Sequence, residues 1–171
     1  MYKTGYLKEK LNMMIRPANE NDIKTIVTVL RKSFKTVADR FGLTLENCPK
    51  HMAFITEEGF KKDINRGARY YLLKNNNDLC GCVALEQKSP DLVYLERLAV
   101  LPEHRHKGFG AMLVKHIFSE AKAIGAKRLE IGLISEDTRL KKWYQDFGFI
   151  QTSIKTVDEL PFPVAFMGVD L

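Results

Sequence analysis

The feature that most constrains the fold is a strand, a glycine turn, a helix and a second strand in succession. LVYLERLAVL, at residues 92–101, is the longest strand signal in the chain. Apolar residues then recur at three- and four-residue spacing, which predicts a helix from about 108 to 124, and RLEIGLI at 128–134 predicts the next strand. Such a unit predicts a parallel strand pair with a right-handed crossover.

Further strand and helix signals flank this unit. Strands are expected at 13–16, 149–157 and 162–170, an antiparallel hairpin at 69–87, and helices from Asn19 and Asp22 onward, at about 52–65 and at 137–146. Strands that precede, interrupt and follow helices in this order predict an α/β fold, with one mixed sheet covered by helices.

Length and composition are those of one folded domain. The 171 residues are 45% hydrophobic and 28% charged, which argues against disorder. The first strand begins at residue 13, so residues 1–12 are expected to be an extension and 13–171 the domain. No apolar run is long enough to span a bilayer, and the N-terminus lacks the apolar centre of a signal peptide.

The cysteines favour a reducing compartment, and a cytoplasmic location is expected. Their number is odd, and no secretory segment accompanies Cys48, Cys80 and Cys82. Cys80 and Cys82 lie two apart on a predicted strand and should share one face. No second cysteine pair or suitably spaced histidine completes a zinc site, so no metal is expected.

The charge balance favours an anionic partner. Lysine and arginine outnumber acidic residues 27 to 21, giving a net charge of +6. These cations are spread along the chain without a basic, aromatic-rich repeat. A phosphorylated cofactor therefore ranks above nucleic acid.

The turn before the 108–124 helix suits a phosphate or pyrophosphate. Gly108 and Gly110 permit close backbone approach, the helix start offers free N–H groups, and Arg105 and Lys107 add positive charge. A Walker loop needs Gly-Lys-Ser/Thr here, and a dinucleotide fingerprint needs a glycine where Leu113 stands. Neither is present. The alternative is an ordinary helix start with exposed cations.

Two motifs narrow the choice. The string V-x-P-x-x-R-x-x-G-x-G, from Val100 to Gly110, resembles the central motif of the GNAT superfamily of acyl-CoA-dependent N-acyltransferases. W-Y-x-x-F-G-F at 143–149 is similar to the family's L-Y-x-x-x-G-F segment. The resemblance covers roughly 13–170. It implies a twisted, mostly antiparallel sheet of about six to seven strands flanked by about four helices.

The resemblance also implies acetyl-CoA as cosubstrate. In similar proteins the turn binds the pyrophosphate through backbone N–H groups, and the preceding strand, splayed from its neighbour, pairs with the pantetheine arm. The arm would contact Leu98, Ala99 and Val100. The pyrophosphate would contact Arg105, His106, Lys107, Gly108, Phe109, Gly110 and Ala111.

Glu96 is the candidate base for the amine. It interrupts an apolar run, and a charge there is costly unless it is paired or functional. Strict alternation would place it with Tyr94, Leu98 and Val100, and Arg97 on the opposite face. A salt bridge or a solvent-facing side chain is the alternative. By resemblance, the N–H of Val100 is the candidate donor to the developing oxyanion.

Tyr144 matches the tyrosine that often protonates the coenzyme A thiolate in similar proteins. The alternative is an aromatic ring packed beneath Trp143 and Phe147. Seven residues earlier the family often has asparagine, and this chain has Asp137. Asp137 is expected either to contact the cofactor arm or, preferably, to cap the 137–146 helix.

His51 lies in a region that often forms the acceptor pocket in similar proteins. A substrate contact, a second base and a plain loop histidine all stay open. The expected activity is acetyl transfer to a primary amine, most simply of a small molecule, in a ternary complex. A peptide or aminoacyl-tRNA acceptor, and a non-catalytic acyl-CoA-binding module, are the alternatives. Dimers are common among similar proteins, and the sequence leaves the oligomeric state open.

Overall fold

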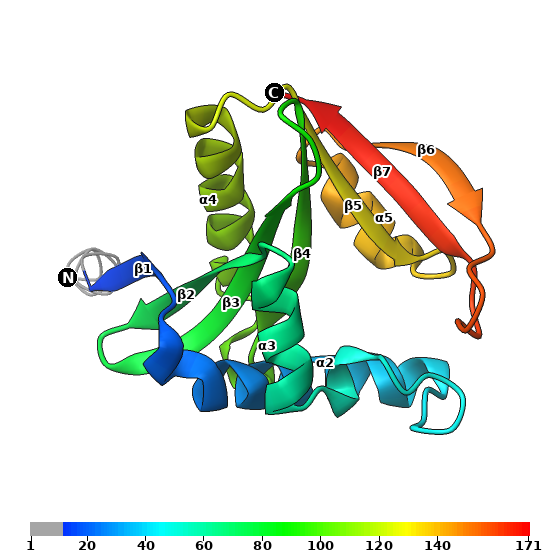
Figure 1. Ribbon diagram of the computed structural model, residues 1–171, viewed down its shortest axis with the longest axis horizontal. Coiled ribbons are helices and arrows are strands. Elements are labelled where there is room, and N and C mark those ends of the chain that lie inside the picture. The colour runs from blue at the N-terminus through cyan, green and yellow to red at the C-terminus, as the bar shows by residue number, and fades with distance from the viewer. Residues whose placement is uncertain (1–11) are drawn as a thin grey trace, which may run out of the picture.

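The computed structural model describes residues 12–171, which form one seven-stranded sheet with helices on both faces (Figure 1). Residues 1–11, nearly all of the expected extension, lie outside the described part. The strands are β1 (Met13–Pro17), β2 (Arg69–Asn75), β3 (Asp78–Gln87), β4 (Leu92–Val100), β5 (Arg128–Ile134), β6 (Ile150–Lys155) and β7 (Val164–Asp170). The helices in this range are α2 (Ile23–Phe41), α3 (Glu57–Asn65), α4 (Phe109–Ala123) and α5 (Thr138–Gln145). The predicted mixed α/β fold is confirmed.

The start of α2 follows from its capping residues. Asn19 accepts a hydrogen bond from the N–H of Asn21, and Asp22 accepts one from the N–H of Asn19, across the 3-10 turn η1 (Glu20–Asp22). The Arg16 guanidinium binds both carboxylate oxygens of Asp22 at 2.7 Å and helps to hold the pKa of that carboxyl below its ordinary value. The helix start predicted from Asn19 and Asp22 is thus confirmed.

The helix expected at 52–65 is divided into the 3-10 turn η2 (Met52–Phe54) and α3. The division falls at Thr56, whose hydroxyl accepts a hydrogen bond from the N–H of Gly59 at 3.1 Å. An N-cap of this kind satisfies a free donor at the start of α3 and holds the preceding backbone in an extended conformation.

The sheet is antiparallel except at its centre. Its order is β1-β2-β3-β4-β5-β7-β6, and β4 and β5 form the parallel pair predicted from the crossover through α4. Their pairing is short, joining Leu92–Tyr94 to Arg128–Glu130. Beyond Tyr94 the two strands separate (Figure 1), so within residues 12–171 the last part of β4 has no strand partner on that side.

Two of the three apolar clusters among the described residues join helices to the two faces of the sheet. On one face Leu113 and Ile117 of α4 pack with Val93 and Leu95 of β4, and Tyr144 of α5 joins them. On the other face, residues of α2 and α3 pack against β2 and β3; among them are Ile26, Leu30, Phe60, Tyr70 and Leu72. The free end of β4 therefore lies between α4 and α5 on one side and α2 on the other.

A β-bulge in β3 corrects the prediction for the cysteines. Leu73 pairs with Gly81 and Lys74 with Leu79, which leaves Cys80 without a partner on β2. Cys80 then packs on the α4 face and Cys82 on the α2 face, both as buried free thiols. The expectation that they share a face was wrong, because a bulge shifts the alternation by one residue.

A second bulge, in β4, corrects the prediction for Glu96. Glu96 pairs with Ala84 and Ala99 with Cys82, so Arg97 and Leu98 both lie opposite Val83. Arg97 takes a left-handed conformation, with φ of 55°. Glu96 consequently lies on the face covered by α2 and α3, whereas Leu98 and Val100 pack against the α4 cluster.

Candidate active site

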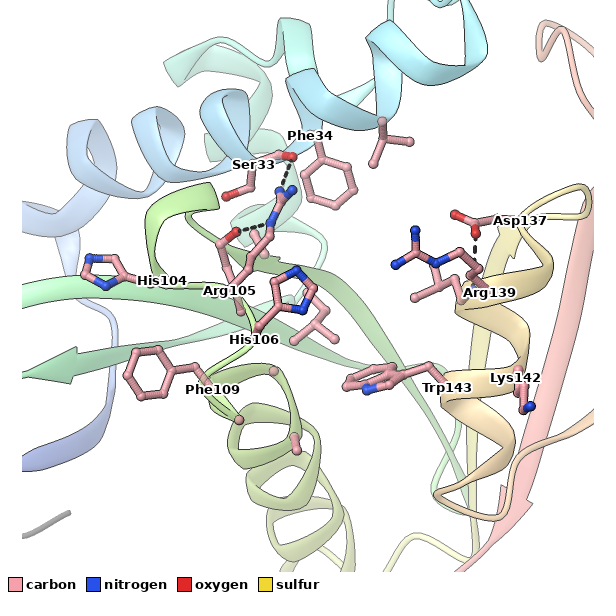
Figure 2. Close-up of a pocket in the computed structure, with 18 of the residues that line it drawn as sticks. Ser33, Phe34, His104, Arg105, His106, Phe109, Asp137, Arg139, Lys142 and Trp143 are labelled. Carbon is pink, nitrogen blue, oxygen red and sulfur yellow. Dashed lines mark hydrogen bonds between the residues drawn. The ribbon is translucent and has the colours of Figure 1, made fainter. Parts of the chain in front are cut away.

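A groove of about 650 Å³ lies beside the free end of β4, bounded by α2, the start of α4 and α5 (Figure 2). Most of the predicted cofactor residues line it: Leu98, Ala99, Val100, Arg105, His106, Gly108, Phe109, Gly110, Ala111 and Asp137. Lys107 is exposed and lies outside this lining, and its cofactor contact stays a prediction. Residues that are distant in sequence thus form one elongated site.

The turn before α4 directs the helix N-terminus into the groove. His106 and Gly108 both have left-handed backbone, with φ of 61° and 83°. Gly108 is the residue before the helix, and Phe109, Gly110 and Ala111 follow it along the groove wall. The first N–H groups of a helix have no intrahelical partner and carry positive partial charge, so this wall suits an anion.

The side chain of Arg105 anchors the turn to its surroundings. Its Nε donates to the carbonyl oxygen of Val100 at 3.1 Å, and Nη1 and Nη2 donate to the Thr36 hydroxyl at 3.0 Å and the Ser33 carbonyl at 2.9 Å. Figure 2 shows this guanidinium pointing toward α2. Burial and the nearby Arg40 lower its pKa. The structure therefore gives Arg105 a positioning role within the predicted site.

At the end of β4 the backbone groups of Val100 and Leu101 point in opposite directions. Leu101 donates its N–H to the Cys80 carbonyl at 2.9 Å. Because backbone groups alternate in direction along a strand, the N–H and carbonyl of Val100 point away from β3. Arg105 donates to that carbonyl, and the Val100 N–H points toward the gap between β4 and β5.

Asp137 caps α5, as the sequence favoured. Its Oδ1 accepts the N–H of Leu140 at 3.2 Å, and its other oxygen pairs with the Arg40 guanidinium of α2. Asp137 is buried and also lines the groove. The ion pair with Arg40 compensates the charge that replaces the family's usual asparagine.

One face of α5 forms a groove wall that the sequence did not predict. Arg139, Lys142, Trp143 and Asp146 line the groove, and their spacing places them on one side of a helix. Figure 2 shows Trp143 pointing from α5 toward the start of α4. A Cβ on Gly110 would lie 3.4 Å from the Trp143 ring, so a glycine there allows close approach. The i, i+3, i+4, i+7 spacing of these four residues could have indicated in the sequence that they share one face of the helix.

Residues of α2 were also missed. Ser33, Phe34, Val37 and Arg40 line the groove from the side opposite α4. Phe34 and Val37 lie at helical spacing, which is equally typical of side chains that face a core, and nothing local indicates that the C-terminal half of α2 extends beyond the sheet. Only the packing of α2 across β4 brings these side chains to the site.

Tyr144 is buried in the cluster on the α4 face, next to Trp143 and Phe149 at centroid distances of 5.0 and 5.4 Å. It is not among the groove-lining residues. Burial raises the pKa of its hydroxyl well above the ordinary value, so the phenol stays protonated at neutral pH. Its role as an acid is a proposal taken up below.

Glu96 belongs to a charged cluster on the α2 and α3 face. Burial raises the pKa of Glu96, and the neighbouring Glu86 carboxylate adds to the effect while Arg97 opposes it. Glu86 is buried, with Lys88 Nζ at 2.7 Å from one oxygen. Arg97, expected on the opposite face, is therefore a close charge neighbour of Glu96, as the β4 bulge requires.

His51 lies beside the groove rather than in its lining. Its ring lies edge-on to the rings of Phe34 and Phe54, with centroid distances of 5.7 and 6.3 Å. Its Nδ1 accepts a hydrogen bond from the N–H of Ala53 at 3.3 Å. Burial, followed by the charge of Arg97, lowers its pKa. The predicted substrate contact of His51 stays a prediction.

Two further features bear on the class of protein. Within residues 12–171, no cluster of histidine, cysteine, aspartate and glutamate could hold a metal ion. No helix in the same range combines the length and apolarity needed to cross a membrane. The site is thus a groove of basic, aromatic and backbone groups beside an opened parallel strand pair.

An opened β4–β5 pair with a helix N-terminus at its gap is the arrangement of acyltransferases of the kind that the motifs resembled. The Acetyltransferase (GNAT) family matches residues 36–149, and the chain belongs to this family. The predicted resemblance is confirmed.

Known relatives differ in their acceptors. An amino-acid acetyltransferase of Neisseria meningitidis is 28% identical over 159 residues, which cover 92% of this chain and 31% of that protein. A [ribosomal protein bS18]-alanine N-acetyltransferase of Salmonella typhimurium is 28% identical over 92 residues, covering 53% of this chain and 62% of that protein. The matched part of this chain thus spans about a third of the length of the Neisseria protein.

Solved structures share the fold. A GNAT family acetyltransferase from Elizabethkingia anophelis with acetyl-CoA bound superposes with a TM-score of 0.66 at 20% identity, covering 94% of this chain and 99% of that one. The ribosomal-protein-S18-alanine N-acetyltransferase from Escherichia coli superposes with a TM-score of 0.73 at 15% identity, covering 92% of this chain and 93% of that one. At these identities the likeness shows the fold alone.

Proposed function

We propose that this protein is an acetyl-CoA-dependent N-acetyltransferase that transfers the acetyl group directly to a primary amine. The observation that carries this proposal is the groove itself. The free end of β4 leads into the N-terminus of α4, so a site for an extended arm joins a site for phosphate. Family membership supports the same activity.

Acetyl-CoA suits the residues present. The N-terminus of α4 would hold the pyrophosphate, with Gly108 allowing the chain to approach it closely. Arg139 and Lys142 of the α5 wall add positive charge, and Leu98 and Val100 would flank the pantetheine arm. When bound, acetyl-CoA supplies the thioester that an amine attacks.

Three groups of the chain would then act on protons and charge. Glu96, directly or through a water molecule, would accept the proton of the attacking amine. The Val100 N–H would stabilise negative charge developing on the thioester oxygen. Tyr144, protonated at neutral pH, would donate its proton to the departing thiolate.

The acceptor is not carried over from the relatives, since one acts on amino acids and another on a ribosomal protein. A small-molecule amine is our first choice and a peptide or aminoacyl-tRNA amine the second. A non-catalytic acyl-CoA-binding module is a different class of function. Glu96 and Tyr144 together favour the enzyme over the module.

The decisive experiment measures coenzyme A release with a thiol reagent while acetyl-CoA and a panel of amines, peptides and aminoacyl-tRNA are supplied. Acetyl-CoA binding is measured in parallel by calorimetry. Amine-dependent release supports the enzyme. Tight acetyl-CoA binding without release on any acceptor would favour the binding module, and absence of binding would contradict the proposed groove.

A further inference from the structure

Arg97 has an unusual backbone conformation, and its side chain has no role in the proposed acetyl transfer. A non-glycine residue with φ of 55° is uncommon, and strained backbone of this kind persists only where its surroundings enforce it. Here the bulge in β4 turns the side chain toward α3 on the α2 and α3 face. The guanidinium is largely buried there, with 25% of the side chain exposed.

The hydrogen-bonding capacity of Arg97 is mostly unused. Nε donates to Oδ2 of Asp63 at 3.3 Å, while Asp63 is also held by Arg66 at 2.9 Å and by the Tyr70 hydroxyl at 3.2 Å. Within residues 12–171, neither Nη atom of Arg97 donates a hydrogen bond. A guanidinium carries four Nη hydrogens in a planar fork that matches a carboxylate.

The next residue presents the opposite charge. Glu96 adjoins Glu86, which is buried and ion-paired with Lys88 at 2.7 Å; its Oε2 lies 3.7 Å from Arg66 and has no hydrogen-bond partner among the described residues. Two neighbouring carboxylates attract an ammonium group, and their mutual repulsion leaves one of them ready to accept a proton. Two carboxylates and an arginine with unused Nη donors therefore lie side by side, with Glu96 and Arg97 at the β4 bulge and Glu86 on β3.

This cluster lies next to the groove. Ala99, two residues after Arg97, lines the groove, and it packs on the same face as α2. Arg97 also lies close enough to His51 to lower its pKa, and His51 contacts Phe34 of the groove wall at 5.7 Å. Arg97, Glu96 and Glu86 lie outside the groove lining, and an acceptor that extends past Ala99 on the α2 face would approach them.

We propose that the acceptor is a small amino acid-like molecule, an amine with a carboxylate close to it. Arg97 binds that carboxylate through its Nη atoms, and Glu96 with Glu86 faces the amino group. This inference rests on the proposed acetyltransferase function and names its acceptor class. It assigns Arg97 as the residue that determines specificity.

Other acceptors suit the pair less well. A peptide N-terminus presents a neutral amide where Arg97 offers a charge, so its Nη donors would lack the charge-assisted hydrogen bond that a carboxylate supplies. A polyamine would bring a second cation toward Arg97, and like charges repel. An amino acid satisfies both halves of the cluster at once.

The first test uses the wild-type chain alone. Coenzyme A release is measured for each common L-amino acid and for its carboxamide, which keeps the amine and side chain and removes the negative charge. For the amino acid that reacts fastest, kcat/KM should fall about 10- to 100-fold in the carboxamide, because a charged hydrogen-bonded pair is lost. Equal or faster reaction of the carboxamide would overturn the inference.

The second test uses two arginines that share Asp63. Arg97→Gln should raise KM for the amino acid and abolish its advantage over the carboxamide, and Arg97→Lys should restore part of that advantage. Arg66→Gln is the comparison variant, since it also removes a partner of Asp63 at 2.9 Å, together with a 3.7 Å ion pair to Glu86, yet offers no fork to the acceptor. An equal loss of preference in Arg66→Gln would mean that disruption of the cluster, rather than carboxylate binding, is responsible.

Failure of the inference and failure of the proposed function differ in outcome. Release with peptides, polyamines or carboxamides but with no amino acid would overturn the acceptor class and retain the enzyme. No release with any amine would overturn both. The wild-type comparison decides the question even where an Arg97 variant fails to fold.

Discussion

The Nε of Arg105 donates a 3.1 Å hydrogen bond to the carbonyl oxygen of Val100 and thereby joins the glycine turn to the strand that precedes it. The same guanidinium reaches Ser33 and Thr36 of α2. One side chain thus fixes three walls of the groove relative to one another. In the sequence this arginine belongs to a basic turn, whereas in the structure its donors are engaged by the protein itself.

Arg105→Gln should therefore lower both stability and acetyl-CoA affinity. Loss of these hydrogen bonds is expected to reduce the free energy of unfolding by about 1–3 kcal/mol, and the displaced turn should weaken acetyl-CoA binding. Urea denaturation and calorimetry measure the two effects. Lys142→Gln, an exposed groove cation, is the control and should weaken binding without changing the unfolding midpoint. An unchanged midpoint in Arg105→Gln would contradict the anchoring role.

Gly108 offers a matched pair of substitutions for the phosphate site. Its φ is 83°, and apart from its chain neighbours no atom of the described residues lies within 4 Å of an added Cβ, so any side chain there is strained but not blocked. Gly108→Ala and Gly108→Glu share that strain, of about 1–2 kcal/mol, and the glutamate alone adds negative charge and bulk. We expect acetyl-CoA affinity at least about tenfold weaker in the glutamate variant than in the alanine variant. Equal affinities would refute the phosphate site.

The pH dependence of turnover should reflect Glu96. A base acts when deprotonated, and burial raises the pKa of Glu96, so kcat should fall with decreasing pH already above the ordinary glutamate range of about 4.3. Glu96→Gln should lower kcat and remove this acidic limb. The profiles are recorded at saturating acceptor. An identical limb in the variant would assign it to another group.

Tyr144→Phe tests the proposed acid while preserving the ring. The packing against Trp143 and Phe149 stays, so folding and acetyl-CoA affinity should change little. Loss of the proton donor should reduce kcat by about 10²-fold or more. Steady-state rates at saturating substrates give the answer, and unchanged turnover would reject the role.

Two substitutions of Asp137 distinguish its role as the N-cap of α5 from its ion pair with Arg40. Asp137→Asn keeps an acceptor for the N–H of Leu140 and loses the charge that pairs with Arg40, whereas Asp137→Ala loses both. The alanine variant should be less stable than the asparagine variant by about 1 kcal/mol, the usual cost of a lost N-cap. Thermal and urea unfolding of both variants measure the difference. Equal stabilities would show that the cap contributes nothing.

The sequence by itself determined the order of elements and the location of the glycine turn. Periodicity, capping residues and turn residues are local, so they could be recognised without the fold, and the strand–helix–strand unit implied the parallel pair. Asp137 as a cap was foreseeable for the same reason. The motifs from Val100 to Gly110 and from Trp143 to Phe149 indicated the family.

Only the tertiary structure decided which side chains meet. A β-bulge is set by pairing between strands, and the bulge in β4 moved Glu96 and Arg97 to one face when alternation had separated them. The partners of Arg105 and the wall formed by α2 depend on how helices pack across the sheet. Such contacts join residues far apart in the chain, and their free energies are not encoded in any local pattern.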